Sequence, residues 1–199
     1  MSIERKVQLI EQLFYQLEKE SAQFQESSGI RCVSGCGKCC SYPNIEASPL
    51  EFLPWAFHLF LNGEAEKTLT RLNETKSSTC FIYEPSTIIN QGSCKSYKYR
   101  GLICRLFGFA ANTDKYGKLR LATCEIIKEG QTEAYNSTNE AVTRGLNIPL
   151  ITAYYMQLNQ IDFHLGNRVL PVNEALKVAL EEVLQYYAYR PFPDVMKKD

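Results

Sequence analysis

The distribution of cysteine constrains this chain more than any other feature of its sequence. All eight cysteines lie between positions 32 and 124, and the flanking residues contain none: Cys32, Cys36, Cys39, Cys40, Cys80, Cys94, Cys104 and Cys124. In a reducing compartment an even, clustered set is typical of metal ligation or redox chemistry, whereas disulfides need an oxidising one. We therefore expect a bound metal to organise the middle of the chain.

The first four cysteines are packed into the short segment 32–40, whose sequence is CVSGCGKCC. A metal lies about 2.3 Å from each sulfur, so the backbone must wrap tightly around it. Gly35 and Gly37 suit this wrapping because glycine allows positive φ and close backbone approach. Adjacent side chains point to different sides of an extended or turning backbone. We therefore expect one of Cys39 and Cys40 to bind the main metal, while the other reaches a second metal, a bridging position or the interior.

The four later cysteines are too widely spaced for a single turn. Neighbours are separated by 13, 9 and 19 residues along the series Cys80, Cys94, Cys104 and Cys124. We expect separate loops to carry them to segment 32–40, so that all eight thiols serve as metal ligands.

Positive charge is concentrated near these cysteines. Segment 80–109 contains four cations and one acid, although the whole chain has no net charge. Buried thiolates are costly unless their negative charge is compensated. We predict that Arg100 and Arg105 compensate the charge of the bound cofactor. The alternative is a solvated basic loop.

The spacing of these residues resembles that of a known family. The matching runs are Cys32-x3-Cys36-Gly-x-Cys39-Cys40, Cys80-Phe-Ile, and Gly92-x-Cys94-x2-Tyr97-x2-Arg100-x3-Cys104-Arg105-x-Phe107-Gly108. This order is similar to that of the YkgJ-type cysteine-cluster family, a zinc- or iron-chelating domain often labelled an Fe-S-cluster-containing protein or Fe-S oxidoreductase. The resemblance covers roughly 32–109, and Cys124 lies outside it. Two positions depart from the family pattern, with Ser96 in place of Ile and Gly101 in place of Pro.

Three metal-dependent functions fit this pattern. Eight thiols exceed what one four-thiolate zinc site needs, which favours an iron–sulfur cluster, first of all a [4Fe-4S] cluster, and a redox or cluster-dependent activity. Zinc or mononuclear iron in a non-catalytic interaction module is the alternative. The spacing Cys32-x3-Cys36-x2-Cys39 also occurs in radical SAM enzymes, a minor alternative. An Fe-S oxidoreductase of unknown substrate is implied by the family's labels alone.

The charge balance and the apolar runs of the chain limit the classes of partner that it can bind. The chain has 199 residues, with 22 basic and 22 acidic side chains, so no basic field attracts nucleic acid. No apolar run is long enough for a signal peptide or a membrane span, and we expect a cytoplasmic protein. Besides the metal ion or cluster, a redox or protein partner of unknown identity is expected. The catalytic residues are unknown, and we expect both His58 and His164 to be structural.

The fold expected is mainly α, a single metal-organised domain with a loop-rich, β-poor cysteine module. Residues 1–28 form an N-terminal helix, 30–128 the metal-binding module and 129–199 the C-terminal helices. The hydrophobic spacing of residues 3–24 predicts one amphipathic helix that ends before Gly29.

Local signals predict further elements. Ser48-Pro49-Leu50-Glu51 has the chemistry of a capping box, so a helix should begin there and stop near Gly63 before a second helix at 64–73. Short β-prone stretches at 80–83 and 118–122 predict strands, with a hairpin connection at 112–117. Three C-terminal helices are expected, at 133–146, 149–163 and, capped by Asn173, 174–188.

Overall fold

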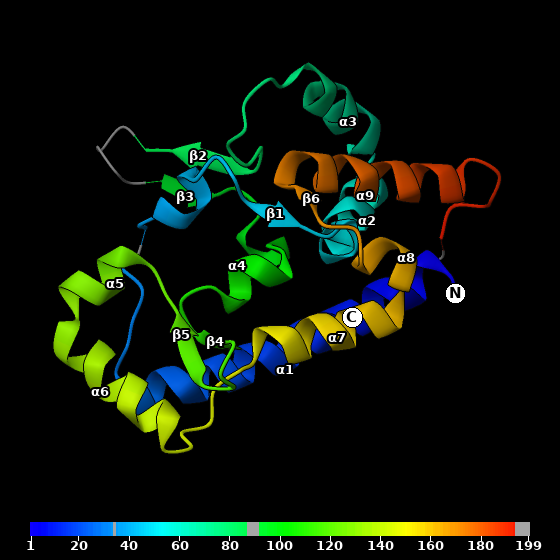
Figure 1. Ribbon diagram of the computed structural model, residues 1–199. Helices are drawn as coiled ribbons and strands as arrows, with labels where there is room; N and C mark the ends of the chain where they lie inside the picture. Colours follow the sequence, from blue (N-terminus) through cyan, green and yellow to red (C-terminus); the bar gives the residue numbers. More distant parts are fainter. Residues whose placement is uncertain (34, 87–91, 194–199) are drawn as a thin grey trace.

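A single long helix, α1 (Ile3–Ser28), spans most of the molecule in the computed structural model, which describes residues 1–33, 35–86 and 92–193 (Figure 1). Ser2 caps its start by accepting a hydrogen bond from the Arg5 N–H. The helix ends at Gly29, whose φ of 72° lies in the left-handed region that favours glycine. The predicted amphipathic helix is therefore confirmed, one turn longer than the hydrophobic spacing indicated.

The predicted capping box starts the next helical segment. Ser48 and Glu51 form reciprocal side-chain to backbone bonds at the start of a 3-10 turn. Gly63, with φ of 71°, follows the first helix, as predicted. The elements here are η2 (Pro49–Phe52), α2 (Leu53–Leu61) and α3 (Ala65–Glu74).

The C-terminal third is helical, with two corrections to the prediction. The expected helix 149–163 is interrupted, because Asp162 is extended and caps a separate short helix through the Leu165 N–H. Asn173 is not a cap, since the last helix already begins at Val172. The helices are α5 (Glu125–Gly130), α6 (Thr132–Thr143), α7 (Ile151–Ile161), α8 (Phe163–Gly166) and α9 (Val172–Tyr187).

The strands of the described chain form three small antiparallel pairs. They are β1 (Glu46–Ala47) with β6 (Leu170–Pro171), β2 (Tyr83–Pro85) with β3 (Gly92–Cys94), and β4 (Ala110–Thr113) with β5 (Leu119–Ala122). The hairpin between β4 and β5 is confirmed, with Gly117 at φ of 77°. The strand predicted at 80–83 is wrong, because Cys80 lies in a turn in which its carbonyl accepts the Tyr83 N–H.

Three short helical turns complete the central region: η1 (Lys38–Ser41), η3 (Tyr97–Tyr99) and α4 (Leu102–Leu106). The fold is thus mainly α with small sheets, as expected. The metal-organised single domain stays a prediction. No helix of the described chain is long and apolar enough to cross a bilayer.

Two apolar clusters stabilise the two ends of α1. The larger packs α1 with α2, α7 and α9 and contains the buried side chains of Phe52 and Trp55. The smaller joins Phe24 of α1 to Leu121 and Ile127, near α5 and α6. Because α1 belongs to both clusters, it fixes the thiol-bearing segments between them (Figure 1).

A buried ion pair links three helices at one end of the molecule. The Lys6 Nζ lies 2.7 Å from Asp162 Oδ2 and 3.7 Å from Glu182 Oε1. Burial raises the pKa of Asp162, but hydrogen bonds from Lys6 and the Leu165 N–H outweigh it, and the pKa lies below its ordinary 3.8. The stabilisation is therefore present above the ordinary carboxyl pKa and is lost as pH falls through the lowered value.

We expect Lys6→Met to lower the free energy of unfolding at neutral pH by about 1.5 kcal/mol, because a half-buried carboxylate loses its cation and its charged hydrogen bond. The exposed Lys19 of the same helix provides the control, and Lys19→Met should change stability by less than about 0.5 kcal/mol. Urea unfolding at several pH values measures both. An effect of Lys6→Met that persists undiminished in strong acid would contradict this account.

Candidate metal centre

The adjacent cysteines Cys39 and Cys40 lie in the 3-10 turn η1. Gly37 precedes the turn with φ of 56°, and its carbonyl accepts the N–H groups of Cys40 and Ser41 at 3.0 and 3.2 Å. The two thiols influence each other, the pKa of Cys39 being lowered and that of Cys40 raised. The expectation that only one of them binds the main metal stays a prediction.

The turn η1 packs directly on β3. The Gly92 N–H donates to the Gly35 carbonyl at 3.3 Å, and a Cβ at Gly37 would lie only 2.6 Å from the Gly92 oxygen. Side chains larger than hydrogen are thus excluded between the two backbones. The contact brings the first cysteine group to the strand that ends in Cys94.

Cys80 is held by a residue that was expected to cap α9. The Asn173 Oδ1 accepts the Phe81 N–H at 2.8 Å, and its amide group donates to the carbonyls of Ser77 and Thr79 at 2.9 Å each. Asn173 therefore ties the segment that contains Cys80 to the start of α9.

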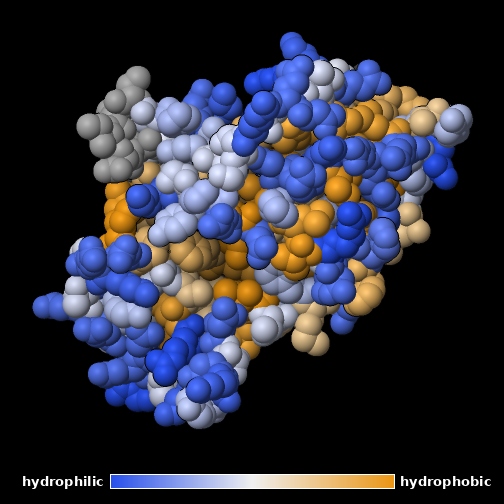
Figure 2. All heavy atoms as spheres, turned by 45° about the horizontal axis from the view of Figure 1, so that its top comes forward, coloured by the Kyte–Doolittle hydropathy of each residue, from blue (hydrophilic) through white to orange (hydrophobic). Residues whose placement is uncertain are grey.

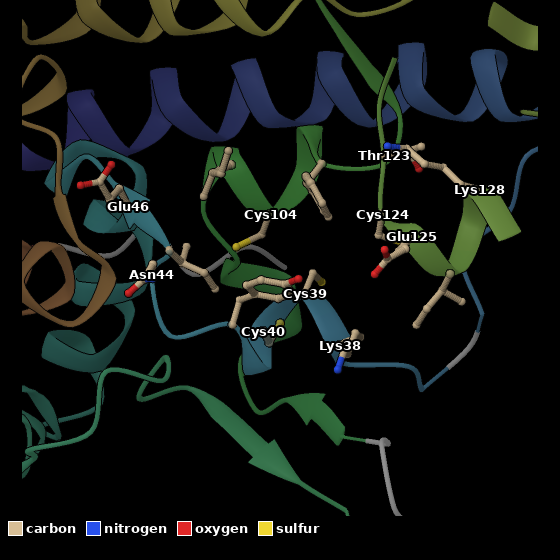
Figure 3. Close-up of a pocket in the computed structure, with 15 residues that line it drawn as sticks. Lys38, Cys39, Cys40, Asn44, Glu46, Cys104, Thr123, Cys124, Glu125 and Lys128 are labelled. Carbon is tan, nitrogen blue, oxygen red and sulfur yellow. The ribbon is translucent and has the colours of Figure 1, made fainter. Parts of the chain in front are cut away.

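Cys104 lies on α4 and faces a cavity shared with three other cysteines. The cavity has a volume of about 620 Å³, and Cys39, Cys40, Cys104 and Cys124 are among the residues that line it. Figure 3 shows the Cys104 sulfur pointing from α4 toward η1. The rest of the cavity wall combines the apolar side chains of Tyr42, Ile45, Ile103, Phe107 and Ile126 with charged ones, namely Lys38, Glu46, Glu125 and Lys128.

The surface around this cavity is apolar as well. Figure 2 shows hydrophobic residues gathered between the β2–β3 hairpin and the α5–α6 pair. Such surroundings favour neutral groups over charged ones.

Five thiols form one electrostatic group. Burial raises the pKa of Cys104, and the charges of Glu51 and of the thiols Cys80, Cys39 and Cys94 raise it further. Burial likewise raises the pKa of Cys80 and Cys94. The pKa of the Cys40 thiol is raised by its hydrogen bond with Cys39 and by burial. The charges of Cys104 and Cys94 raise it further. The hydrogen bond from Cys40 in turn lowers the pKa of Cys39.

Four thiols form a second group, which shares Cys39 with the first. Burial raises the pKa of Cys32, and the neighbouring thiols Cys36, Cys39 and Cys124 raise it further. Cys124 begins α5 at the far side of the cavity. The predicted ligands thus gather on both sides of η1, and Cys39 belongs to each group.

All eight cysteines are free thiols. Within residues 1–33, 35–86 and 92–193, no three His, Cys, Asp or Glu side chains are already arranged to hold one metal ion. Binding therefore requires some of the sulfurs to turn toward a common centre. The donor set fits zinc or iron, because both accept several thiolates in a largely apolar environment.

Arg100 and Arg105 bind chiefly to protein groups. The Arg105 guanidinium lies against the Phe14 ring, pairs with Glu18 of α1 and donates to the carbonyls of Arg100 and Lys98. It therefore anchors the segment before Cys104 to α1.

Arg100 influences a thiol through its charge. Its positive charge lowers the pKa of Cys94, opposing the effect of burial. Its guanidinium also stacks on Tyr97 and lies 3.5 Å from Glu18. Compensation of cofactor charge by either arginine stays a prediction.

The sequence analysis missed Glu51 as part of this region. The side chain is fully buried, and its Oε2 accepts the Ile103 N–H, next to Cys104, at 2.9 Å. The capping box drew attention to Glu51 only as a helix start. Of the two histidines, His58 stacks on Tyr99 and His164 is exposed on α8.

We expect Gly37→Ala to disrupt the contact between η1 and β3. Gly35→Ala is the matched control, because Gly35 also has positive φ but no described atom lies within 4 Å of its added Cβ. Both variants lose stability because alanine is unfavourable at positive φ. The free energy of unfolding of Gly37→Ala should fall by about 2 kcal/mol more, through overpacking. Urea unfolding and metal content of the purified variants measure the difference. Equal losses would show that the close approach to Gly92 is unimportant.

Comparison with known proteins supports the resemblance seen in the sequence. The family model "CxxCxxCC: Putative zinc- or iron-chelating domain" matches residues 31–136, slightly more than half of the chain. No curated protein and no solved structure matches. The matched range begins just before Cys32 and extends through α5, so it includes all eight cysteines. The chain belongs to the CxxCxxCC family of zinc- or iron-chelating domains.

Proposed function

We propose that the chain binds an iron–sulfur cluster through thiolates from η1, β3, α4 and the turn before β2. The observation that carries this proposal is the convergence of thiols on one cavity, which Cys39, Cys40, Cys104 and Cys124 line, with β3 and its Cys94 packed on η1. These thiols come from four separate segments, so their proximity is a property of the fold. Family membership supports metal binding itself.

The number of thiols favours a cluster over one zinc ion. Four thiolates complete a tetrahedral zinc site, and this chain offers eight, with Cys39 common to two groups. We propose a [4Fe-4S] cluster held mainly by the five-thiol group. When bound, such a cluster accepts and donates single electrons.

The chain's own residues would support the cluster in distinct ways. Asn173 and Glu51 hold the segments that carry Cys80 and Cys104. Arg100 places a positive charge near Cys94. The apolar side chains of the cavity wall limit water around the sulfurs, and the cavity itself leaves room for a redox or protein partner.

A zinc-binding interaction module is the second candidate. The Cys36-x2-Cys39 spacing is common in zinc sites, and the second thiol group contains both residues. Mononuclear iron would use the same thiolates. A radical SAM activity is less well supported, since the described strands form only three small antiparallel pairs and no run of alternating strands and helices.

Anaerobic purification tests the cluster directly. We expect brown protein that contains iron and acid-labile sulfide in similar amounts, and Cys104→Ser should lose most of both because it removes a sulfur from the five-thiol group. Cys124→Ser is the matched comparison, since Cys124 lines the same cavity but belongs to the other group. We expect Cys124→Ser to retain most of the iron.

Two results would redirect this proposal. Colourless protein with zinc alone would favour the interaction module. Equal metal loss in Cys104→Ser and Cys124→Ser would contradict the division into two thiol groups.

Metal binding should weaken as the solution becomes more acidic. Burial raises the pKa of Cys80, Cys94 and Cys104 above the ordinary 9.0, so these thiols are protonated at neutral pH before metal binds. Each must lose its proton to become a ligand, and affinity should fall about tenfold per pH unit for each proton released. Competition with a chelator at several pH values measures this slope. A slope near zero would exclude these thiols as ligands.

A further inference from the structure

Glu51 is a buried carboxylate that no described cation neutralises. Its side chain has no exposed surface, and within the described residues it takes part in no ion pair. Four donors surround it instead. Its Oε1 accepts from the Ser48 N–H at 2.8 Å, the Ser48 hydroxyl at 3.1 Å and the Tyr155 hydroxyl at 3.1 Å, and its Oε2 accepts the Ile103 N–H at 2.9 Å.

This set of partners suits an ionised carboxylate. Two carboxylate oxygens together offer about four acceptor positions, and all four partners of Glu51 are donors. A glutamine side chain has the same size but only one oxygen. It therefore cannot accept hydrogen bonds from Ser48 and Tyr155 on one side and from Ile103 on the other. The hydrogen bonds therefore favour a carboxylate at this position, and they act against burial, which raises the pKa of Glu51.

The bond to Ile103 determines how α4 begins. The first N–H groups of a helix have no partner within the helix. In α4 one of these groups, that of Ile103, donates to Glu51, and Cys104 follows immediately. The orientation of the Cys104 side chain thus depends on a residue that lies 52 positions before Ile103 in the chain.

The charge of Glu51 also reaches the sulfur of Cys104. It is one of the groups that raise the pKa of the Cys104 thiol, after burial itself. The pKa of the Tyr155 hydroxyl is raised by burial and by the charges of Glu51 and Cys104. Glu51, Tyr155 and Cys104 therefore form one electrostatically connected unit beside the cavity.

We propose that Glu51 is a positioning residue for the metal centre, one that fixes the start of α4 and thereby aims the Cys104 sulfur. This inference rests on the proposed function, because it concerns the metal that Cys104 would help to bind. It adds a residue outside the cysteine motif to the machinery of the site.

The test uses Glu51→Gln in the full-length, metal-loaded protein. The glutamine oxygen can keep the partners on the Ser48 and Tyr155 side, but its amide group then faces the Ile103 N–H, donor against donor. We expect a chelator to remove metal roughly fivefold faster or more, the equivalent of one lost hydrogen bond. If the metal is iron, the reduction potential should also shift, because the Cys104 sulfur is no longer held in the same position.

Three further variants separate this role from simple destabilisation. Tyr155→Phe keeps the Ile103 bond, so it should release metal more slowly than Glu51→Gln and should leave the potential unchanged. Glu4→Gln removes a carboxylate in the first turn of α1 that also accepts from a tyrosine, Tyr187. Leu180→Ala removes buried side-chain volume from α9, and Leu180 makes none of the hydrogen bonds to Glu51.

The outcomes distinguish the two proposals. If metal-loaded Glu51→Gln matches Glu4→Gln in release rate, the positioning role is wrong even though the chain binds metal. The same conclusion follows if Leu180→Ala, at equal loss of stability, releases metal as fast. If the wild-type chain binds neither iron nor zinc, the proposed function fails, and this inference fails with it. Faster release from Glu51→Gln alone supports it.

Discussion

The backbone contact between η1 and β3 is the interaction on which the thiol-rich region depends. Gly37 and Gly92 meet without intervening side chains, and the Gly92 N–H completes the contact by donating to Gly35. Because this approach is so close, the turn that carries Cys39 and Cys40 is held against the strand that carries Cys94. The positions of the remaining thiols follow from elements packed around this pair.

Burial and charge oppose each other throughout this region. Apolar side chains of the cavity wall and mutual repulsion favour neutral thiols in the metal-free protein, whereas a bound cation stabilises thiolates. The fold therefore couples metal binding to proton release. Nearby charges come from Glu51 and Arg100, which act in opposite directions on Cys104 and Cys94. The metal environment is thus set by residues outside the cysteine motif as well as within it.

Local sequence signals predicted the helices well and the loops less well. The start of η2 at Ser48, the end of α1 at Gly29 and the turn at Gly117 all depend on neighbouring residues, and all are confirmed. Asn173 was mistaken for a cap because its real partners, the backbone around Phe81, lie far away in the sequence. The helix predicted at 149–163 is interrupted, because Asp162 caps α8 and pairs with Lys6.

The sequence alone determined the donor chemistry, the family and the mainly helical character of the chain. These properties depend on residue type and on spacings of a few residues, which periodicity and capping rules can read. Only the tertiary structure decided which thiols are neighbours, and that Arg105 is tied to α1 and Glu51 to α4. The bonds of Glu51 join residues 52 and 104 positions apart. Contacts between residues so far apart in the sequence are determined by packing of the whole chain, so no local sequence pattern predicts them.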